Sequence, residues 1–298
     1  MANIRISNIC GLCAGCKRSI DTAKQLAARN KVVLYKEIVH NQNVNSMLQG
    51  LGINTILDLK DAKKNEHVVL RAHGEPPQTY EFLKENNIDY SDCTCPNVTK
   101  IHNLVREYSL NDYTIILIGK YGKTNGKTHP EVFGTIGWCL NTPVLIEDTE
   151  DAINFTPTKN NKYYLVCQTT FNENKADSFI NIIAKSCKEY GSELIINKSI
   201  CSAQKSINSA SIDLAKSCDV MIVVGGKNSS NSIELFNNIK SKLNAIFIDN
   251  IKNWKNELFE QNIPFDPNTR FGITAGASTM KEELFELKNL IEEELKKV

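Results

Sequence analysis

The sequence lacks an excess of charge of either sign, because 35 Lys and Arg residues face 34 Asp and Glu residues in a chain of 298 residues. A formal net charge of +1 excludes a polybasic surface as the main binding device, so nucleic acid is not expected as a partner. No apolar run approaches the roughly 20 residues of a membrane helix. The N-terminus has no long apolar signal core, so a cytoplasmic protein without membrane contact is expected.

The chain also lacks low-complexity segments and linkers rich in proline or glycine. Its length suits two or three compact units, which should therefore pack against one another. Short β-branched runs end in loops of small polar residues, and helical patterns follow several of them. These runs cover residues 3–10, 31–39, 67–74, 113–122, 162–170, 219–226, 243–249 and 270–278. Strands that alternate with helices predict an α/β fold with parallel sheets, whose strand ends gather ligands.

The ten cysteines need an explanation other than disulfides, because a chain of this length in a reducing compartment needs no cross-links. Clusters of cysteines in such a protein indicate metal or redox chemistry. Cys139, Cys167, Cys187 and Cys218 are interpreted as small buried hydrophobic residues. Cys10, Cys13 and Cys16 have the spacing that begins a ferredoxin cluster motif, but no fourth cysteine follows locally. The next cysteines beside turns are Cys93, Cys95 and Cys201. Cys13, Cys95 and Cys201 fall roughly one in each third of the chain, which by spacing alone is a weak indication of a shared metal site.

Polar loops suggest an anionic ligand. Of the five histidines, His40, His73 and His129 follow strand patterns or precede helices, where they could bind an anion or move a proton. His67 and His102 are interpreted as surface or capping residues. Residues 168–170, 228–232 and 274–278 place hydroxyl and amide groups after predicted strands. One such loop would be plain helix capping, whereas three favour a phosphate or carboxylate site.

Glu131 is the acidic residue of interest, because it follows His129 and Pro130 at a predicted helix start. Its charge there could simply complement the helix dipole. Alternatively, it is a proton donor.

These motifs together resemble the 4-hydroxy-3-methylbut-2-enyl diphosphate reductase family. The resemblance rests on eight segments in order: GLCAG, EIVHN, RAHG, TCPNVTK, HPEVFGTIG, QTT, VVGGKNSSNS and GITAGAS. It implies three α/β lobes related by a pseudo-threefold axis around a central cavity that holds an iron–sulfur cluster. The expected lobes are residues 1–95, 96–198 and 199–298.

The resemblance also implies a mechanism. Cys13, Cys95 and Cys201 would hold a [4Fe–4S] cluster and leave one iron open to the substrate hydroxyl. Glu131 would supply protons, with Thr169 and His129 organising the path. The implied diphosphate ligands are His40, His73, His129, Ser229, Ser230, Asn231 and Ser278. An external donor of the ferredoxin or flavodoxin type would supply electrons.

Some positions depart from the family pattern. The Lys120–Thr128 loop is longer than the family's turn, Gln204, Ile207 and Asn208 replace the usual residues after Cys201, and Met280 replaces a common proline. Cys10 and Cys16 are extra thiols with three interpretations, as inert neighbours, a source of cluster heterogeneity or alternative ligands. The inert interpretation is favoured, because each lobe of the family supplies one thiolate. The departures leave open a divergent paralogue that reduces another hydroxylated substrate. A third hypothesis is an electron carrier or redox sensor, which would leave Glu131 without a role.

Overall fold

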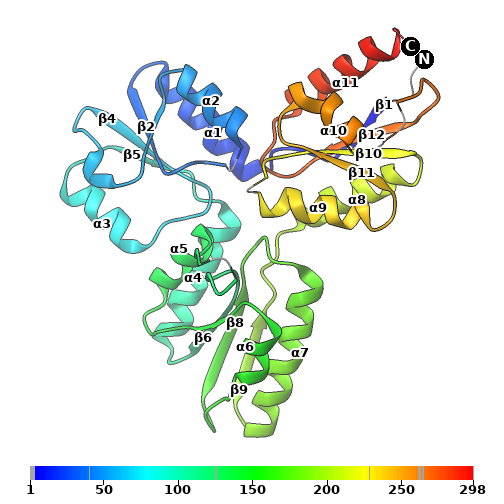
Figure 1. The fold of residues 1–298 in the computed structure, drawn as a ribbon. Coiled ribbons are helices and arrows are strands. Elements are labelled where there is room, and N and C mark those ends of the chain that lie inside the picture. The colour runs from blue at the N-terminus through cyan, green and yellow to red at the C-terminus, as the bar shows by residue number, and fades with distance from the viewer. Residues whose placement is uncertain are drawn as a thin grey trace. The chain divides into compact units, whose positions relative to one another are not determined.

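The computed structural model describes residues 4–39, 41–124, 126–227, 229–260, 263 and 265–297. Their strands form three four-stranded sheets, with helices between successive strands (Figure 1). The strand orders are β1-β12-β10-β11 in sheet A, β3-β2-β4-β5 in sheet B and β7-β6-β8-β9 in sheet C. The prediction of three parallel α/β lobes is confirmed.

The bounds of the strands follow the chain. They are β1 Ile4–Ile6, β2 Lys31–Tyr35, β3 Asn54–Ile56, β4 Glu66–Leu70, β5 Tyr90–Asp92, β6 Thr114–Ile118, β7 Val144–Ile146, β8 Lys162–Cys167, β9 Glu193–Asn197, β10 Val220–Val224, β11 Asn244–Ile248 and β12 Phe271–Ala275. The helices are α1 Ala14–Ala27, α2 Gln42–Gly50, α3 Pro77–Glu85, α4 Pro96–Leu110, α5 Pro130–Trp138, α6 Thr149–Asn154, α7 Glu173–Tyr190, α8 Ser202–Ala215, α9 Ser230–Lys240, α10 Trp254–Glu260 and α11 Lys281–Leu295.

The eight apolar runs recognised in the sequence each contain a strand. They include every central strand, namely β2, β4, β6, β8, β10 and β12, because a central parallel strand is covered on both faces and is apolar throughout. The four strands without a recognised run, β3, β5, β7 and β9, all lie at sheet edges. Three of them are only three residues long, and their side chains are mostly exposed or half-buried, so their apolar pattern is weak.

The chain divides into two compact units. The first comprises Met1–Arg29, Glu37–Thr55 and Ser202–Val298 and contains all of sheet A. The second comprises Asn30–Lys36 and Ile56–Cys201 and contains all of sheet C. In the first unit, β1 pairs in parallel with β12, so the N-terminal strand completes a sheet built from the C-terminal part of the chain. The division into lobes at residues 95 and 198 stays a prediction.

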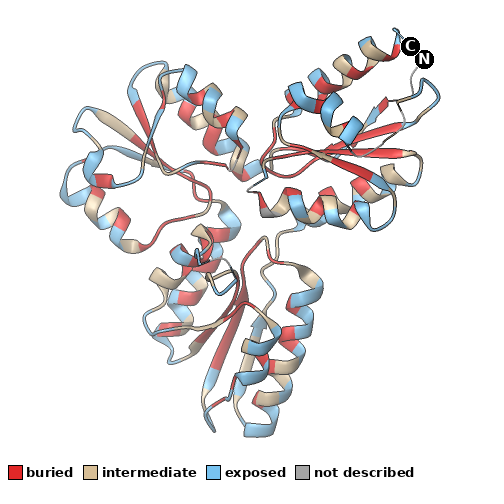
Figure 2. Ribbon diagram, in the orientation of Figure 1, coloured by how far each residue is buried: buried red, intermediate tan, exposed pale blue. Residues whose placement is uncertain are grey.

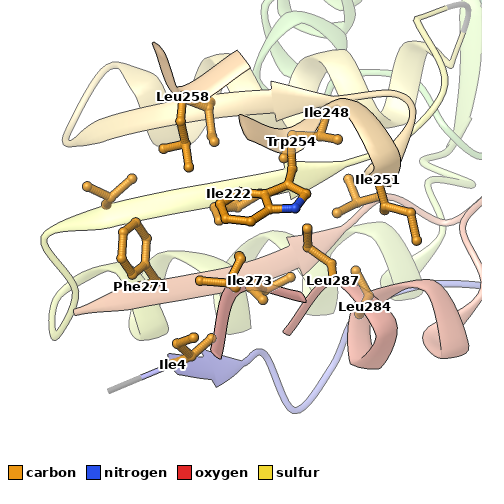
Figure 3. Close-up of a cluster of buried hydrophobic side chains, with 14 of the residues drawn as sticks. Ile4, Ile222, Ile248, Ile251, Trp254, Leu258, Phe271, Ile273, Leu284 and Leu287 are labelled. Atoms are coloured by element: carbon orange, nitrogen blue, oxygen red, sulfur yellow. The ribbon is translucent and has the colours of Figure 1, made fainter. Parts of the chain in front are cut away.

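The core of the first unit lies on both faces of β10. Val220, Ile222 and Val224 point to one face, where Trp254 and the helix α11 pack (Figure 3). Met221 and Val223 contribute to a second cluster on the opposite face. Figure 2 shows the same distribution in each sheet, with buried residues concentrated on the strands and on one side of each helix. This packing fixes the strand ends from which the loops emerge.

His102 differs from the expectation of a surface or capping residue. Its side chain on α4 is 3% exposed and stacks on Trp138, with ring centroids 5.5 Å apart. Burial lowers the pKa of His102 to about 4, because the charged form is disfavoured away from water. The indole ring of Trp138 in α5 covers this histidine instead of water. Among the described residues, no helix is both long and apolar enough to cross a membrane.

Candidate functional site

The carboxyl group of Glu131 lies at the carboxyl-terminal edge of sheet C. Because β6 and β8 are adjacent and parallel, the loops that follow them meet at one edge. The loop after β6 leads to Glu131 in the first turn of α5, and the loop after β8 contains Thr169. The Thr169 backbone N–H donates to Glu131 Oε1 at 2.6 Å, and the Thr169 hydroxyl donates to Oε2 at 2.7 Å. The structure thus brings together two residues that were predicted to act in proton transfer.

His129 caps the same helix. Its Nδ1 accepts a hydrogen bond from the Glu131 backbone N–H at 3.2 Å, so the ring is fixed beside the acid. The His73 ring lies edge-on to it, with the centroids 5.5 Å apart. The approach of the two loops requires glycine at position 134 of α5, because a Cβ there would lie 2.9 Å from the carbonyl oxygen of Gly74. The small residue in α5 therefore brings the loop of His73 against the loop of His129.

Burial controls the protonation of Glu131, which is 2% exposed. Removal from water raises the pKa of its carboxyl group from 4.5 to about 7, although the two hydrogen bonds from Thr169 act in the opposite direction. A carboxyl group with a pKa near neutrality can hold a proton and release it to a reacting oxygen. Of the two interpretations left open by the sequence, this geometry favours the proton donor.

The raised pKa predicts that the second unit becomes less stable as pH increases. Between pH 4.5 and about pH 7 the folded state keeps a proton on Glu131 that the unfolded state has lost. The contribution of Glu131 to the free energy of unfolding therefore decreases across this window and is constant above it. At about 1.4 kcal/mol per pKa unit, the loss is on the order of 3 kcal/mol.

The measurement is urea unfolding at about pH 4.5 and about pH 8, followed by Trp138 fluorescence in a Trp254→Phe background. Trp138 ends the helix that begins beside Glu131. The free energy of unfolding is compared with that of a Glu131→Gln variant, so that the contributions of other titrating groups cancel. A difference between the two proteins that does not change with pH would contradict the assignment of a protonated Glu131.

Two of the three candidate ligand thiols belong to the second unit. Cys95 caps α4, and its backbone N–H donates to the Ala72 carbonyl at 3.0 Å. Cys201 directly precedes α8, and its backbone N–H donates to the Thr169 carbonyl at 2.7 Å. The Asn97 amide, two residues after Cys95, donates to the Cys201 sulfur at 3.5 Å. The start of α4 therefore lies against Cys201, and Cys201 is one hydrogen bond from the residue that holds Glu131.

The third candidate thiol, Cys13, belongs to the first unit. It caps α1, and its sulfur accepts a hydrogen bond from the Cys16 backbone N–H at 3.5 Å. The loop is held against sheet A, since the Cys13 backbone N–H donates to the Ala277 carbonyl at 3.3 Å. Hydrogen bonding from the Cys16 side chain, aided by backbone N–H groups, outweighs burial and lowers the pKa of Cys13 to about 6. The thiol is therefore readily ionised to the form that binds metals.

Three serine hydroxyls meet at the ends of β10 and β12 in the first unit. The Ser278 and Ser232 hydroxyls each donate to the Ser229 hydroxyl oxygen at 3.1 Å. All three side chains are buried, and Ser229 caps α9. A Cβ at Gly276 would lie 2.3 Å from the Ser232 hydroxyl, so only glycine fits there. Hydroxyls beside a helix N-terminus suit an anion.

The remaining predicted site residues are placed as follows. Asn231 lies in the first turn of α9, and its carbonyl accepts a hydrogen bond from the Gln204 side chain at 3.5 Å. Ser230 is the first residue of α9, but its side chain is outside the described part, and His40 is outside it altogether. Among the described residues, no three His, Cys, Asp or Glu side chains form a group that could hold a metal ion.

The structure also gives contacts to residues to which the sequence analysis assigned no individual role. Asn97 contacts the sulfur of Cys201, and Gln168 accepts the Lys120 backbone N–H at 3.0 Å. Ser232 joins the serine cluster, and Glu147 holds the loop before His129. Gln168 and Ser232 had a signal as members of the polar loops 168–170 and 228–232, and Asn97 had one because it follows Cys95 and Pro96 in the first turn of a helix.

Comparison with known proteins gives a consistent result. Residues 4–292 match the family model described as LytB protein. The chain is similar to the 4-hydroxy-3-methylbut-2-enyl diphosphate reductase of Clostridioides difficile, with 33% identity over 93% of this chain and 94% of that protein. A reductase of the same name from Thermoanaerobacter sp. is 33% identical over 93% of this chain and 92% of its own length.

Two solved structures share the fold. The E-1-hydroxy-2-methyl-but-2-enyl-4-diphosphate reductase of Plasmodium falciparum aligns with a TM-score of 0.83 and 27% identity, over 97% of this chain and 87% of that one. A structure of (E)-4-hydroxy-3-methyl-but-2-enyl diphosphate reductase, the terminal enzyme of the non-mevalonate pathway, aligns with a TM-score of 0.72 and 29% identity. That match covers 98% of this chain and 100% of the other.

Proposed function

The chain belongs to the LytB protein family, and we propose that Glu131, held by Thr169, is the proton donor of its reaction. The protein is an oxidoreductase that reduces 4-hydroxy-3-methylbut-2-enyl diphosphate to isopentenyl and dimethylallyl diphosphate. The substrate loses its hydroxyl group, and two electrons and two protons convert that group to water and complete the product. The buried carboxyl group of Glu131, held by both donors of Thr169, whose carbonyl accepts the Cys201 backbone N–H, is the observation that carries the proposal.

The proposed cofactor is a [4Fe–4S] cluster held by Cys13, Cys95 and Cys201. The donor set fits such a group, since each thiol starts a helix, where the dipole favours a thiolate, and Cys13 has a lowered pKa. When bound, a cluster with three thiolate ligands supplies electrons and one iron that is open to the substrate hydroxyl.

The acid side of the reaction is assigned to the second unit. Glu131 delivers a proton from Oε1 or Oε2 to the departing hydroxyl, and Thr169 holds both oxygens in place. The His129 ring is fixed by the hydrogen bond that its Nδ1 accepts from the Glu131 backbone N–H, and it helps to organise the path of the proton beside Glu131. The buried position of Glu131 keeps bulk water from exchanging its proton freely.

The diphosphate group of the substrate is bound by hydroxyl, amide and imidazole groups in this proposal. The Ser278 and Ser232 hydroxyls donate to the Ser229 hydroxyl oxygen, so the three hydroxyls face one another at the start of α9. A bound anion would accept hydrogen bonds from the Ser229 and Ser278 hydroxyls in place of their mutual one, and the backbone N–H groups at the start of α9 add their dipoles. The further proposed ligands are His40, His73, His129, Ser230 and Asn231.

Two further assignments complete the proposal. Electrons come from an external carrier of the ferredoxin or flavodoxin type, since the reaction consumes a pair of electrons at each turnover. The protein is assigned to the cytoplasm.

The test is turnover by protein purified without oxygen. The purified protein is given 4-hydroxy-3-methylbut-2-enyl diphosphate and a chemical reductant, and both five-carbon diphosphates are followed over time. Formation of both products is the expected result. Absence of both products from protein with a full, reducible cluster would instead favour a paralogue with another hydroxylated substrate.

A further inference from the structure

The Glu147 carboxylate binds the loop that leads from β6 to the proton donor. Its Oε2 accepts the backbone N–H groups of Tyr121, Gly122 and Lys123 at 3.0, 2.9 and 2.9 Å. Its Oε1 accepts the Thr124 backbone N–H at 3.3 Å and the Thr124 hydroxyl at 2.7 Å. Five donors therefore converge on one carboxylate, which lies at the end of β7 and is 9% exposed.

The shape of this loop depends on the carboxylate. Consecutive backbone N–H groups that point to one side form a concave anion site, and without an anion they would repel one another. Gly122 has φ +106°, which favours glycine, and a Cβ there would lie 3.1 Å from the backbone of Lys127. Burial would raise the pKa of Glu147, but the hydrogen bonds from the loop outweigh burial and lower it. Glu147 is therefore ionised when it binds the loop.

The loop returns to the proton-transfer site. The Thr128 hydroxyl donates to the Tyr121 carbonyl at 2.8 Å, and the His129 backbone N–H donates to the Lys120 carbonyl at 2.8 Å. These two bonds join the last residues of the loop to its first residues. His129 in turn accepts the backbone N–H of Glu131. An unbroken series of hydrogen bonds thus leads from Glu147 to the start of α5.

We propose that Glu147 is a positioning residue for proton transfer. Its carboxylate fixes the turn at residues 121–124, and this turn fixes His129 and the first turn of α5, which carries Glu131. The inference rests on the proposed role of Glu131 as proton donor. It gives a function to the Lys120–Thr128 loop, one of the segments in which the sequence analysis noted a departure from the family pattern.

Glu147→Gln tests this role. The glutamine has the same shape, but its NH₂ group faces three backbone N–H donors in one orientation of the amide and the Thr124 backbone N–H in the other. The backbone N–H groups of residues 121–124, 128, 129, 131 and 132 are expected to exchange with deuterium at least about tenfold faster, because the loop opens more often. The kcat is expected to fall roughly 10- to 100-fold, with KM within about twofold, since misplacement of the acid affects the chemical step.

Glu150→Gln is the matched control. Glu150 is exposed and binds Lys123 Nζ at 3.0 Å together with Asp148 and Asp151, and it has no hydrogen bond to the backbone of the described part of the loop. This variant removes the same charge and is expected to leave exchange and kcat unchanged. Thr124→Val removes one donor and keeps the carboxylate, so it gives a smaller change of the same kind if Glu147→Gln does not fold.

The outcomes separate this inference from the function itself. No turnover by the unchanged protein would refute the proposed function, while deuterium exchange would still report on the loop. Normal exchange in folded Glu147→Gln overturns the positioning role. Faster exchange with an unchanged kcat also overturns it, because the loop would then open more often without any effect on catalysis. An equal fall in kcat for Glu150→Gln would assign the effect to surface charge and overturn it as well.

Discussion

A Glu131→Gln protein is expected to form both products between about 100- and 10,000-fold more slowly than the unchanged protein, the range that a positioned acid contributes. The reason is chemical, because the amide has no proton of comparable acidity to give. Its shape still fits, since the amide oxygen can accept the Thr169 backbone N–H and the amide NH₂ can donate to the Thr169 hydroxyl. The loss should therefore appear in kcat and not in folding.

The measurement pairs turnover with the absorption spectrum of the cluster. An intact spectrum with lost turnover excludes a simple electron carrier, which would have no use for a buried acid. Thr169→Val is a useful second variant, because it removes the hydroxyl but leaves the backbone N–H to Glu131 Oε1. Its kcat should lie between those of the unchanged protein and Glu131→Gln. Nearly normal turnover by Glu131→Gln would require another proton donor.

Replacement of Cys13, Cys95 or Cys201 by serine is expected to abolish stable cluster binding. With only three thiolates available, the loss of one leaves too few ligands for a four-iron cluster. Iron and acid-labile sulfide per chain are measured after anaerobic reconstitution, together with the absorption spectrum. These readouts do not depend on activity, so they test the ligand assignment directly.

Cys10→Ser and Cys16→Ser are the matched controls and should retain the cluster. Cys10 is 5% exposed, its thiol donates to the Ser7 carbonyl at 3.0 Å, and burial raises its pKa, so it is not a ready thiolate. Cys16 lies inside the first turn of α1, where its backbone N–H supports the sulfur of Cys13. A full cluster in Cys13→Ser together with its loss in Cys16→Ser would reverse the assignment of these two residues.

Of the four cysteines interpreted as small buried hydrophobic residues, three are fully buried. Cys167, Cys187 and Cys218 are buried beside strands and helices, and burial raises the pKa of each. Cys139 is half-buried, donates to the Thr135 carbonyl at 3.4 Å and has a pKa raised to about 12 by burial. A thiol that does not ionise is a poor metal ligand. Apolar context was enough to identify these residues.

The sequence by itself determined the fold class and the loops that carry the candidate site. A central strand of a parallel sheet must be apolar throughout, so the run from Thr114 to Ile118 or from Val220 to Val224 identifies a strand without any knowledge of its neighbours. Polar residues directly after such runs lie at strand ends, which is where Thr169 and Ser229 are found. Both features are local along the chain.

Only the tertiary structure decided which of these loops meet. Glu131 and Thr169 are 38 residues apart, and Ser229 and Ser278 are 49 residues apart, yet each pair is hydrogen-bonded. Periodicity reports which residues are buried but not which strand lies beside which, so it could not predict the pairing of β1 with β12 or the contact of Glu147 with the loop. The proton on Glu131 has the same origin, because its pKa depends on burial by residues distant in sequence.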